Sequence, residues 1–169
     1  GITSYPMLAD SGSGVAWGSF GYVPSGASGA FASSSPADAL FDLVGALKNG
    51  YLPGASWVTK RSVITAIRKF KEATTLAYIW QPGLQQGQPE RLLGYPVNRM
   101  EDMPTIAANS YSMAFGDFRQ GYQILDRQGM RTLRDPFTAK PYVKFYTTKR
   151  VGGGAKNFEA VKFMKFATS

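Results

Sequence analysis

Two short stretches in the first half of the chain carry apolar residues at helical spacing. The first, residues 38–47, follows Ser35 and Pro36, which suit the N-cap and the first position of a helix, and Gly50 suits its end. The second, residues 60–71, combines an apolar face with several cations. Each pattern predicts a short helix that buries one face.

The other apolar runs indicate β-strands. Residues 55–58, centred on Trp57, form a short run bounded by turn residues. Residues 130–134 and 142–148 alternate with a period of two and are rich in aromatic and β-branched residues. We predict a strand at each of these places and a last strand at residues 160–166.

Turn residues separate the strands of the second half. Asp126 to Gly129 and the pair Asp135-Pro136 contain residue types that favour tight turns. The three glycines at residues 152–154 predict a tight or flexible reversal before the last strand. Consecutive glycine amides could instead form an anion-binding nest, but the spacing and the ending of a phosphate-binding loop are missing, so a hairpin turn is favoured.

Two segments follow neither period. Residues 1–36 are rich in Gly, Ser and Ala, which predicts a loosely structured leader, although the aromatic residues between 15 and 23 suit a short strand or an extended arm. Residues 72–89 mix apolar residues with Pro, Gly and Gln, as a long functional loop does. Large apolar side chains in such a loop suit a subunit interface. The interface candidates are Trp80, Gln81, Leu84, Gln85 and Gln86.

The composition excludes most catalytic chemistry. With 169 residues, the chain is long enough for about one domain with its own core. It has neither cysteine nor histidine, which excludes disulfides, the usual zinc sites and histidine-dependent nucleophiles. The carboxylates Glu101, Asp102, Asp117 and Asp126 could do acid–base work, but their neighbours make turn chemistry the better explanation. We therefore predict no enzymatic activity, no cofactor and no metal.

The net charge of +8 arises entirely beyond residue 47. Residues 1–47 contain three Asp and no Lys or Arg. A positive excess of this size fits a polyanionic partner, and a merely solvated basic surface explains it equally well. No run of about eighteen apolar residues is present, so no membrane span is predicted.

Aromatic residues alternate with cations in the last third of the chain. Tyr142, Phe145, Tyr146 and Phe158 could form a stacking platform for single-stranded nucleic acid. A β-sheet whose aromatic residues face a core, with cations facing solvent or a neighbouring subunit, explains the same pattern. The sheet interpretation is favoured, and a basic nucleic-acid-binding β-rich domain is the alternative function.

Short motifs follow one another in a fixed order along nearly the whole chain. The most specific are Phe115-Gly-Asp-Phe, residues 122–127 and residues 134–154. The others are Gly1-Ile-Thr-Ser-Tyr-Pro, Trp17-Gly-Ser-Phe-Gly-Tyr, residues 38–47, Ile67-Arg-Lys-Phe-Lys, Trp80-Gln-Pro-Gly-Leu, Gly87-Gln-Pro and Leu93-Gly-Tyr-Pro-Val. Each motif alone is weakly specific. Their ordered series resembles the C-terminal part of tailed-bacteriophage major capsid proteins of the Hong Kong 97 type.

The resemblance implies an α+β fold of the Hong Kong 97 capsid type. An axial lobe, a mixed sheet flanked by helices, would comprise residues 37–128 and 160–169, after a leader of residues 1–36. A peripheral lobe would contribute long β-strands within residues 129–159. The matched part of the family follows an N-terminal arm, an extended loop and a spine helix. These elements are therefore expected to be absent from this chain, which begins at Gly1 and looks like a piece of a longer protein.

The resemblance also implies a structural function. Full-length subunits would self-assemble as pentamers and hexamers into an icosahedral shell that encloses double-stranded DNA, in a phage, a prophage or a gene-transfer particle. Further partners would be scaffold, prohead protease and portal proteins, with packaged DNA bound by non-specific electrostatics, in a virion assembled in the bacterial host cytoplasm. Residues 72–89 would make subunit contacts around the capsomer axis. The strand residues Arg134, Lys144 and Arg150 are further interface candidates.

Overall fold

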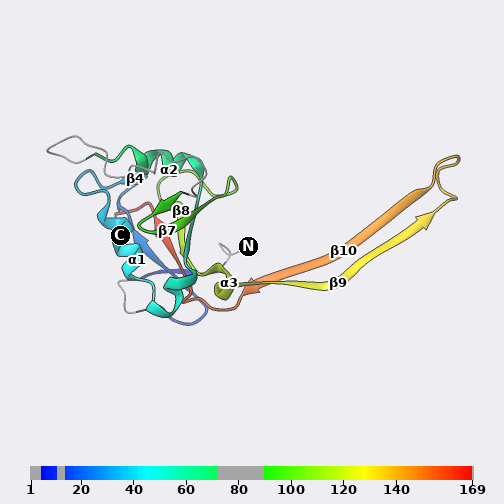
Figure 1. Cartoon of the computed structure of the whole chain (residues 1–169), viewed down its shortest axis with the longest axis horizontal. Coiled ribbons are helices and arrows are strands. Elements are labelled where there is room, and N and C mark those ends of the chain that lie inside the picture. Colours follow the sequence, from blue (N-terminus) through cyan, green and yellow to red (C-terminus); the bar gives the residue numbers. More distant parts are fainter. Residues whose placement is uncertain (1–4, 11–13, 72–89, 169) are drawn as a thin grey trace.

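The computed structural model describes residues 5–10, 14–71 and 90–168. These residues form two regions of different shape (Figure 1). One is a rounded body built around a seven-stranded sheet. The other is a long two-stranded hairpin, residues 122–155, that projects away from the body.

The sheet of the body is mixed, and its strands come from both ends of the chain. β11 lies between β2 and β8, so the last strand is inserted between an early strand and a middle strand. It runs parallel to β2 and antiparallel to β8. In spatial order the strands are β1 (Met7–Ala9), β2 (Phe20–Pro24), β11 (Val161–Lys165), β8 (Tyr111–Gly116), β5 (Ser56–Thr59), β7 (Tyr95–Arg99) and β6 (Arg91–Leu92). A separate ribbon pairs β3 (Gly26–Ala27) with β4 (Ala30–Phe31).

Side chains that alternate along the central strands bury both faces of the sheet. On β5, Trp57 belongs to one cluster of buried residues and Val58 to the other. On β8, Phe115 and Ala114 are divided in the same way. The ring centroids of Trp57 and Phe115 lie 4.4 Å apart. The body therefore has a core of its own. Burial of each large apolar side chain in it stabilises the fold by about 1.5–3 kcal/mol.

Two helices, α1 (Asp38–Gly45) and α2 (Arg61–Arg68), pack on the sheet. The other helical segments of the described residues are the 3-10 helix η2 (Asn49–Gly54) and α3 (Phe118–Gly121). None of these described helices has the length and apolar character needed to cross a membrane. Both longer helices bury one side in the cluster that contains Trp57, through Leu40, Leu43, Val63 and Ile67.

Most regular elements of the body agree with the sequence to within a few residues. The predicted strands at residues 55–58 and 160–166 are β5 and β11, and the predicted helices are α1 and α2. The predicted start of α1 is wrong. Ser35 has a φ of 51°, and its carbonyl accepts a hydrogen bond from the Asp38 amide at 3.1 Å, so a turn precedes the helix. Ala37 is the N-cap, without a side-chain bond, and Gly50 lies in η2.

The N-terminal segment is more ordered than its Gly and Ser content predicts. Phe20–Pro24 forms β2, an internal strand of the sheet, and the Phe20 side chain is completely buried. A loosely structured leader is therefore the wrong description of this part of residues 1–36. Sheet hydrogen bonds and buried aromatic rings outweigh the conformational freedom of the glycines around them.

Two turn predictions in the hairpin are also wrong. Asp126 to Gly129 lie within β9 (Tyr122–Asp135), and Gly152 to Gly154 lie within β10 (Lys144–Ala155). The ladder shifts register on both sides of Arg150, which accommodates the turn-type residues opposite it as irregularities in continuous strands. The chain reverses between β9 and β10, where Asp135-Pro136 predicts a turn.

Candidate assembly surface

The hairpin consists of two long strands without a core. β9 has 14 residues and β10 has 12, and the two pair only with each other among the described strands. A two-stranded hairpin is marginally stable in water on its own, and open strand edges favour pairing with further strands. Its exposed apolar side chains are Ile124, Leu125, Met130, Leu133, Phe137, Tyr142, Val143, Phe145, Tyr146 and Val151. An apolar surface of this extent suits burial against a partner.

Apolar side chains occupy both faces of the hairpin. Leu133 lies directly opposite Tyr146, and the next pair along the ladder, Phe145 with Arg134, points to the other face. The prediction that the aromatic residues of this region face a core is therefore wrong for Tyr142, Phe145 and Tyr146, which are all exposed. Phe158, in contrast, is buried in the body.

The three consecutive glycines leave a groove on the hairpin. Gly152 lies opposite Leu125 and Gly153 lies opposite Ile124, so these two apolar side chains have no side chain directly across the ladder. The groove lies on the face of Leu125 and is lined by the three glycines and by Leu125, Asp126, Arg127, Lys149, Arg150 and Val151. Glycine within a strand often marks a place where another backbone can approach closely.

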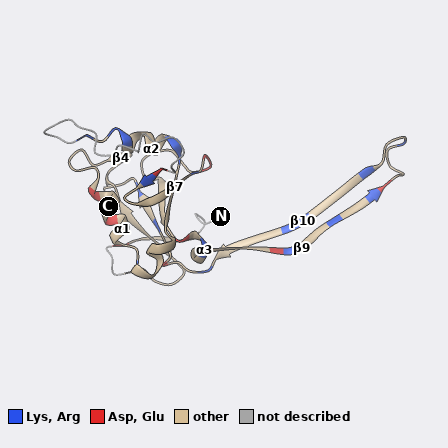
Figure 2. Ribbon diagram, in the orientation of Figure 1, with Lys and Arg blue, Asp and Glu red and all other residues tan. Residues whose placement is uncertain are grey.

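The hairpin is strongly basic (Figure 2). Residues 122–155 contain seven Lys or Arg and only two Asp. Asp126 forms an ion pair with Lys149 at 2.8 Å. The other carboxylate belongs to Asp135, at the hairpin tip. The cations are Arg127, Arg131, Arg134, Lys140, Lys144, Lys149 and Arg150.

The Asp135 carboxylate organises the turn at the hairpin tip. It accepts hydrogen bonds from the Thr138 hydroxyl, from the Phe137 amide at 2.9 Å and from the Thr138 amide at 3.2 Å. These donors favour the charged form, so they lower the pKa of Asp135, with the Thr138 hydroxyl as the largest cause. The tip is therefore a defined turn that presents Phe137 to solvent.

The predicted interface residues fall into two groups. Arg134, Lys144 and Arg150 are exposed on the hairpin, and Lys144 lies opposite Asp135, beside Arg134. Arg150 lies farther from the tip, opposite Gln128. The residues predicted in the loop lie outside the described residues, namely Trp80, Gln81, Leu84, Gln85 and Gln86.

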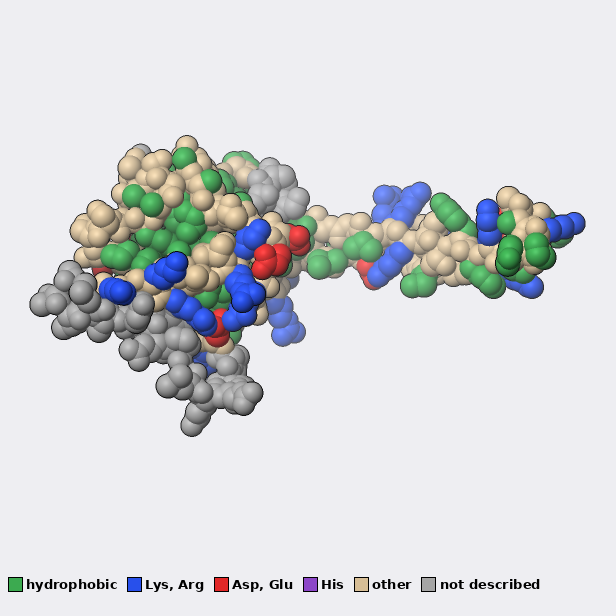
Figure 3. Space-filling model, turned by 90° about the horizontal axis from the view of Figure 1, so that it is seen from above, with side chains coloured by type: hydrophobic (Ala, Val, Ile, Leu, Met, Phe, Trp, Pro, Cys, Tyr) green, Lys and Arg blue, Asp and Glu red, His purple; other side chains and the backbone are tan. Residues whose placement is uncertain are grey.

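A second group of cations lies on the body around α2. Figure 3 shows cations interspersed with carboxylates on this side of the body. Glu90 forms ion pairs with both Arg68 and Arg99, the latter at 2.7 Å, and Lys60 lies 3.9 Å from Glu101. Nearby carboxylates thus partly neutralise this surface, whereas the hairpin has only two carboxylates for its seven cations.

Three of the four carboxylates considered for catalysis make structural contacts. Asp117 is the N-cap of α3 and accepts hydrogen bonds from the amides of Arg119 at 3.0 Å and Gln120 at 3.2 Å. Asp126 pairs with Lys149, and Glu101 lies near Lys60. Within the described residues, no group of three or more Asp or Glu could hold a metal ion.

The sequence interpretation missed the apolar side chains along the hairpin. Ile124 and Leu125 are adjacent, so they point to opposite faces of a strand, and Phe145 and Tyr146 do the same. A strand that is apolar on both faces is expected either to be buried on both faces within its own chain or to be covered by another chain. That double-sided pattern was the available signal.

Comparisons with known proteins identify relatives of this arrangement. A family model described as "Phage capsid family" matches residues 1–166. Two solved structures, the capsid of an empty GTA particle and the capsid of a native GTA particle, each computed with C5 symmetry, match with TM-scores of 0.87 and 0.86. Both are 48% identical and cover 99% of this chain. The chain covers 56% and 60% of theirs. No curated protein sequence matches. The likeness confirms the predicted α+β capsid fold.

Proposed function

Because the chain belongs to the phage capsid family, we propose that it is part of a major capsid subunit whose hairpin binds neighbouring subunits while its body forms shell wall. The observation that carries this proposal is the hairpin itself. Its two strands, which have no core, and the segment between them expose ten large apolar side chains. Burial of these side chains in an assembly would supply the stability that the isolated hairpin lacks.

The two regions correspond to the two lobes that the resemblance implies. The body is the axial lobe, predicted at residues 37–128 and 160–169, with the addition of β1 and β2 from the N-terminal segment. The hairpin is the peripheral lobe, predicted within residues 129–159. The continuous course of β9 supports a boundary at Tyr122 rather than near residue 129.

Shell building requires contacts that close into rings. The related GTA capsid structures were computed with C5 symmetry, which supports pentamers, and we extend this to hexamers. Ring contacts join different patches on successive copies, so a protruding hairpin and a rounded body are suitable partners. Residues 72–89 are proposed to lie at the ring axis. Scaffold, prohead protease and portal proteins are proposed as partners, with assembly in the bacterial host cytoplasm and no enzymatic role for this chain.

Charge reversal on the hairpin tests the proposal. The test uses a protein that contains this chain and has the full length of the related capsid proteins. In it, we expect the double variant Arg134→Glu with Lys144→Glu to form no closed particles in electron micrographs. The matched control, Arg61→Glu with Lys69→Glu, makes the same charge change at exposed residues at the two ends of α2 and should leave particles intact. Equal loss in both variants, or particles in neither the variants nor the parent protein, would contradict the proposal.

Nucleic-acid binding by the hairpin is a second candidate function. The seven cations and the exposed aromatic rings of the hairpin support it. Such binding would weaken by about a thousandfold or more between about 50 mM and about 200 mM salt if six or more phosphates were neutralised. Fluorescence anisotropy with double-stranded DNA would measure this. Tight, salt-sensitive binding by a full-length protein that stays monomeric would favour this function over shell building.

A further inference from the structure

The hairpin joins the body where β10 ends, at Ala155 and Lys156, and we call this junction the root. Several segments of the body contact the root. The Ala155 amide, at the end of β10, donates a hydrogen bond to the Tyr5 hydroxyl at 3.1 Å. The next amide, that of Lys156, donates to the Gly121 carbonyl at 2.9 Å. The root is therefore tied both to the N-terminal segment and to the end of α3.

Aromatic rings reinforce the root. Phe158, which follows the root, has its ring centroid 5.4 Å from that of Tyr5, 5.0 Å from that of Phe20 and 5.3 Å from that of Trp17. Aromatic pairs at these separations, of which those with Tyr5 and Trp17 are edge-to-face, add to the stabilisation that burial provides. Three rings from the first part of the chain thus enclose one ring at the root.

A buried ion pair anchors the other end of the same N-terminal segment. Asp10 forms an ion pair with Lys162 of β11, and the two side chains are 1% and 2% exposed. Asp10 also accepts a hydrogen bond from the Gly14 amide at 3.1 Å. A Cβ atom on Gly21 would lie 2.6 Å from the Asp10 carboxylate and 2.8 Å from the Lys162 ammonium, so only glycine leaves room for the pair.

Backbone hydrogen bonds fix the segment between these two anchors. The Phe20 amide donates to the Pro6 carbonyl at 2.9 Å, and the Asp10 amide donates to the Tyr22 carbonyl at 2.9 Å. β1 pairs with β2 in parallel along the same stretch. Residues 5–10 therefore contact the hairpin root at one end and the core of the sheet at the other.

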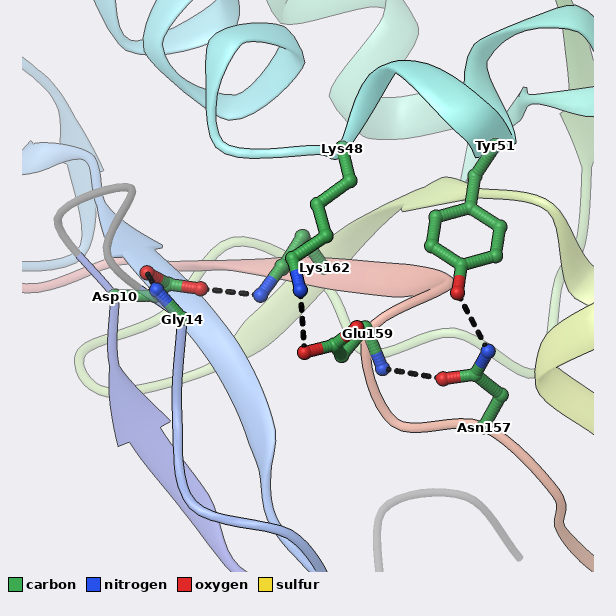
Figure 4. Close-up of polar contacts among 7 residues, drawn as sticks. All are labelled: Asp10, Gly14, Lys48, Tyr51, Asn157, Glu159 and Lys162. Atoms are coloured by element: carbon green, nitrogen blue, oxygen red, sulfur yellow. Dashed lines mark hydrogen bonds and ion pairs between the residues drawn. The ribbon is translucent and has the colours of Figure 1, made fainter.

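Weaker polar contacts join the residues that follow the root to η2 and its N-cap residue Lys48 (Figure 4). Lys48 pairs with Glu159 at 2.7 Å, and the Asn157 side-chain amide donates to the Tyr51 hydroxyl at 2.7 Å. Exposed pairs such as Lys48 with Glu159 contribute little to stability in water. The buried pair differs, because removing one partner would leave the other charge desolvated.

From this geometry we infer that residues 5–10 are a conformational clasp, which fixes the direction of the hairpin relative to the body. Tyr5 binds the root through its hydroxyl, which accepts a hydrogen bond from the Ala155 amide. Asp10 keeps the clasp attached to the body because it neutralises the buried Lys162. Release of the clasp would leave Lys162 unpaired inside the body, so the engaged state is strongly favoured. A force or partner that pulls residues 5–10 away would release the hairpin as well.

Distance measurements between two spin labels test this inference on the single chain, independently of any assembly. The chain has no cysteine, so Ser34→Cys on the body and Thr148→Cys on the hairpin introduce the only thiols. We expect one narrow distance distribution in the parent chain. Tyr5→Phe, which keeps the ring, and Asp10→Asn, which keeps the shape, should each broaden it.

Hydrogen exchange gives a second readout at the root. Tyr5→Phe removes the acceptor of the Ala155 amide, so exchange of that amide should accelerate by about fivefold. A double variant, Asp10→Leu with Lys162→Met, removes both charges and should recover the narrow distribution that Asp10→Asn loses, since two apolar residues can replace a buried pair.

The controls separate a clasp from a general contribution to stability. Val63→Ala creates a cavity under α2 and lowers global stability, but it should leave the distance distribution narrow. Lys48→Gln should have almost no effect on either readout. The inference is overturned if Tyr5→Phe leaves both the distribution and the Ala155 exchange unchanged, or if Val63→Ala broadens the distribution as much as Asp10→Asn does.

Discussion

Phe115 in the body and Phe145 in the hairpin are the same residue type in the same kind of strand, but their surroundings differ completely. Phe115 has no exposed surface and contacts Trp57, whereas 67% of Phe145 is exposed. In the body, aromatic side chains stabilise the fold of the single chain. In the hairpin, the same kind of side chain is left exposed by the single chain, as the proposed contacts with neighbouring subunits require.

The largest expected effect contrasts these two phenylalanines. We expect Phe115→Ala to lower the free energy of unfolding by about 3–5 kcal/mol, because it removes a buried ring and leaves a cavity. Phe145→Ala should change it by less than about 0.5 kcal/mol, because nothing in the chain buries that ring. Urea denaturation followed by tryptophan fluorescence measures both. Similar losses in the two variants would mean that the hairpin folds with a core.

A pair of glycines provides the next contrast. Gly116 has a φ of 151°, and a Cβ there would collide with the Ala160 carbonyl, so Gly116→Ala should destabilise the body by at least about 1–3 kcal/mol. Gly129 in the hairpin has no atom within 4 Å of such a Cβ, and Gly129→Ala should stay within about 0.5 kcal/mol of the parent. Thermal unfolding of the two variants, measured side by side, tests the difference.

The junction between the regions should respond to a smaller extent. Asp117 caps the short helix from which β9 continues, and Asp117→Ala should cost about 0.5–2 kcal/mol. Asp117→Asn can still accept the amide hydrogen bonds and should recover most of this loss. Hydrogen exchange at residues 119–122 reports the effect locally. If alanine and asparagine behave alike, the cap contributes nothing.

The smallest effect concerns the hairpin tip and depends on pH. The pKa of Asp135 is lower in the folded turn than in the unfolded chain, so its carboxylate stabilises the turn above the unfolded pKa of about 3.9. That contribution is lost as the pH falls through the lower, folded pKa. NMR shifts of the Phe137 and Thr138 amides should report a tip transition in acid. Thr138→Val removes the largest cause of the lowered pKa and should move the transition to higher pH.

The sequence predicted the body better than the hairpin for a physical reason. In α1 and α2 the apolar period matches the face that is buried, and β5 and β11 are short segments buried on both faces, so local pattern and tertiary structure agree. The motif series also predicted the capsid fold correctly. The cap at Ser35 failed because a backbone turn, fixed by the surrounding packing, took the place of a side-chain bond.

The turn predictions in the hairpin failed because residue types that favour turns lie inside its strands. Gly152 to Gly154 and Asp126 to Gly129 have the composition of turns, but pairing with the opposite strand determines their conformation. Long-range pairing cannot be read from a single segment. The interface role of Arg134, Lys144 and Arg150 stays a prediction, with their exposure on the hairpin as its present support.

The position of β11 in the middle of the sheet has a consequence for biosynthesis. Residues 161–165 separate β2 from β8, so the sheet cannot close until this part of the chain has left the ribosome. Residues 122–155 emerge earlier, with their apolar strands already exposed. The hairpin is thus synthesised before the sheet of the body can be completed, and its apolar side chains remain exposed in the folded single chain.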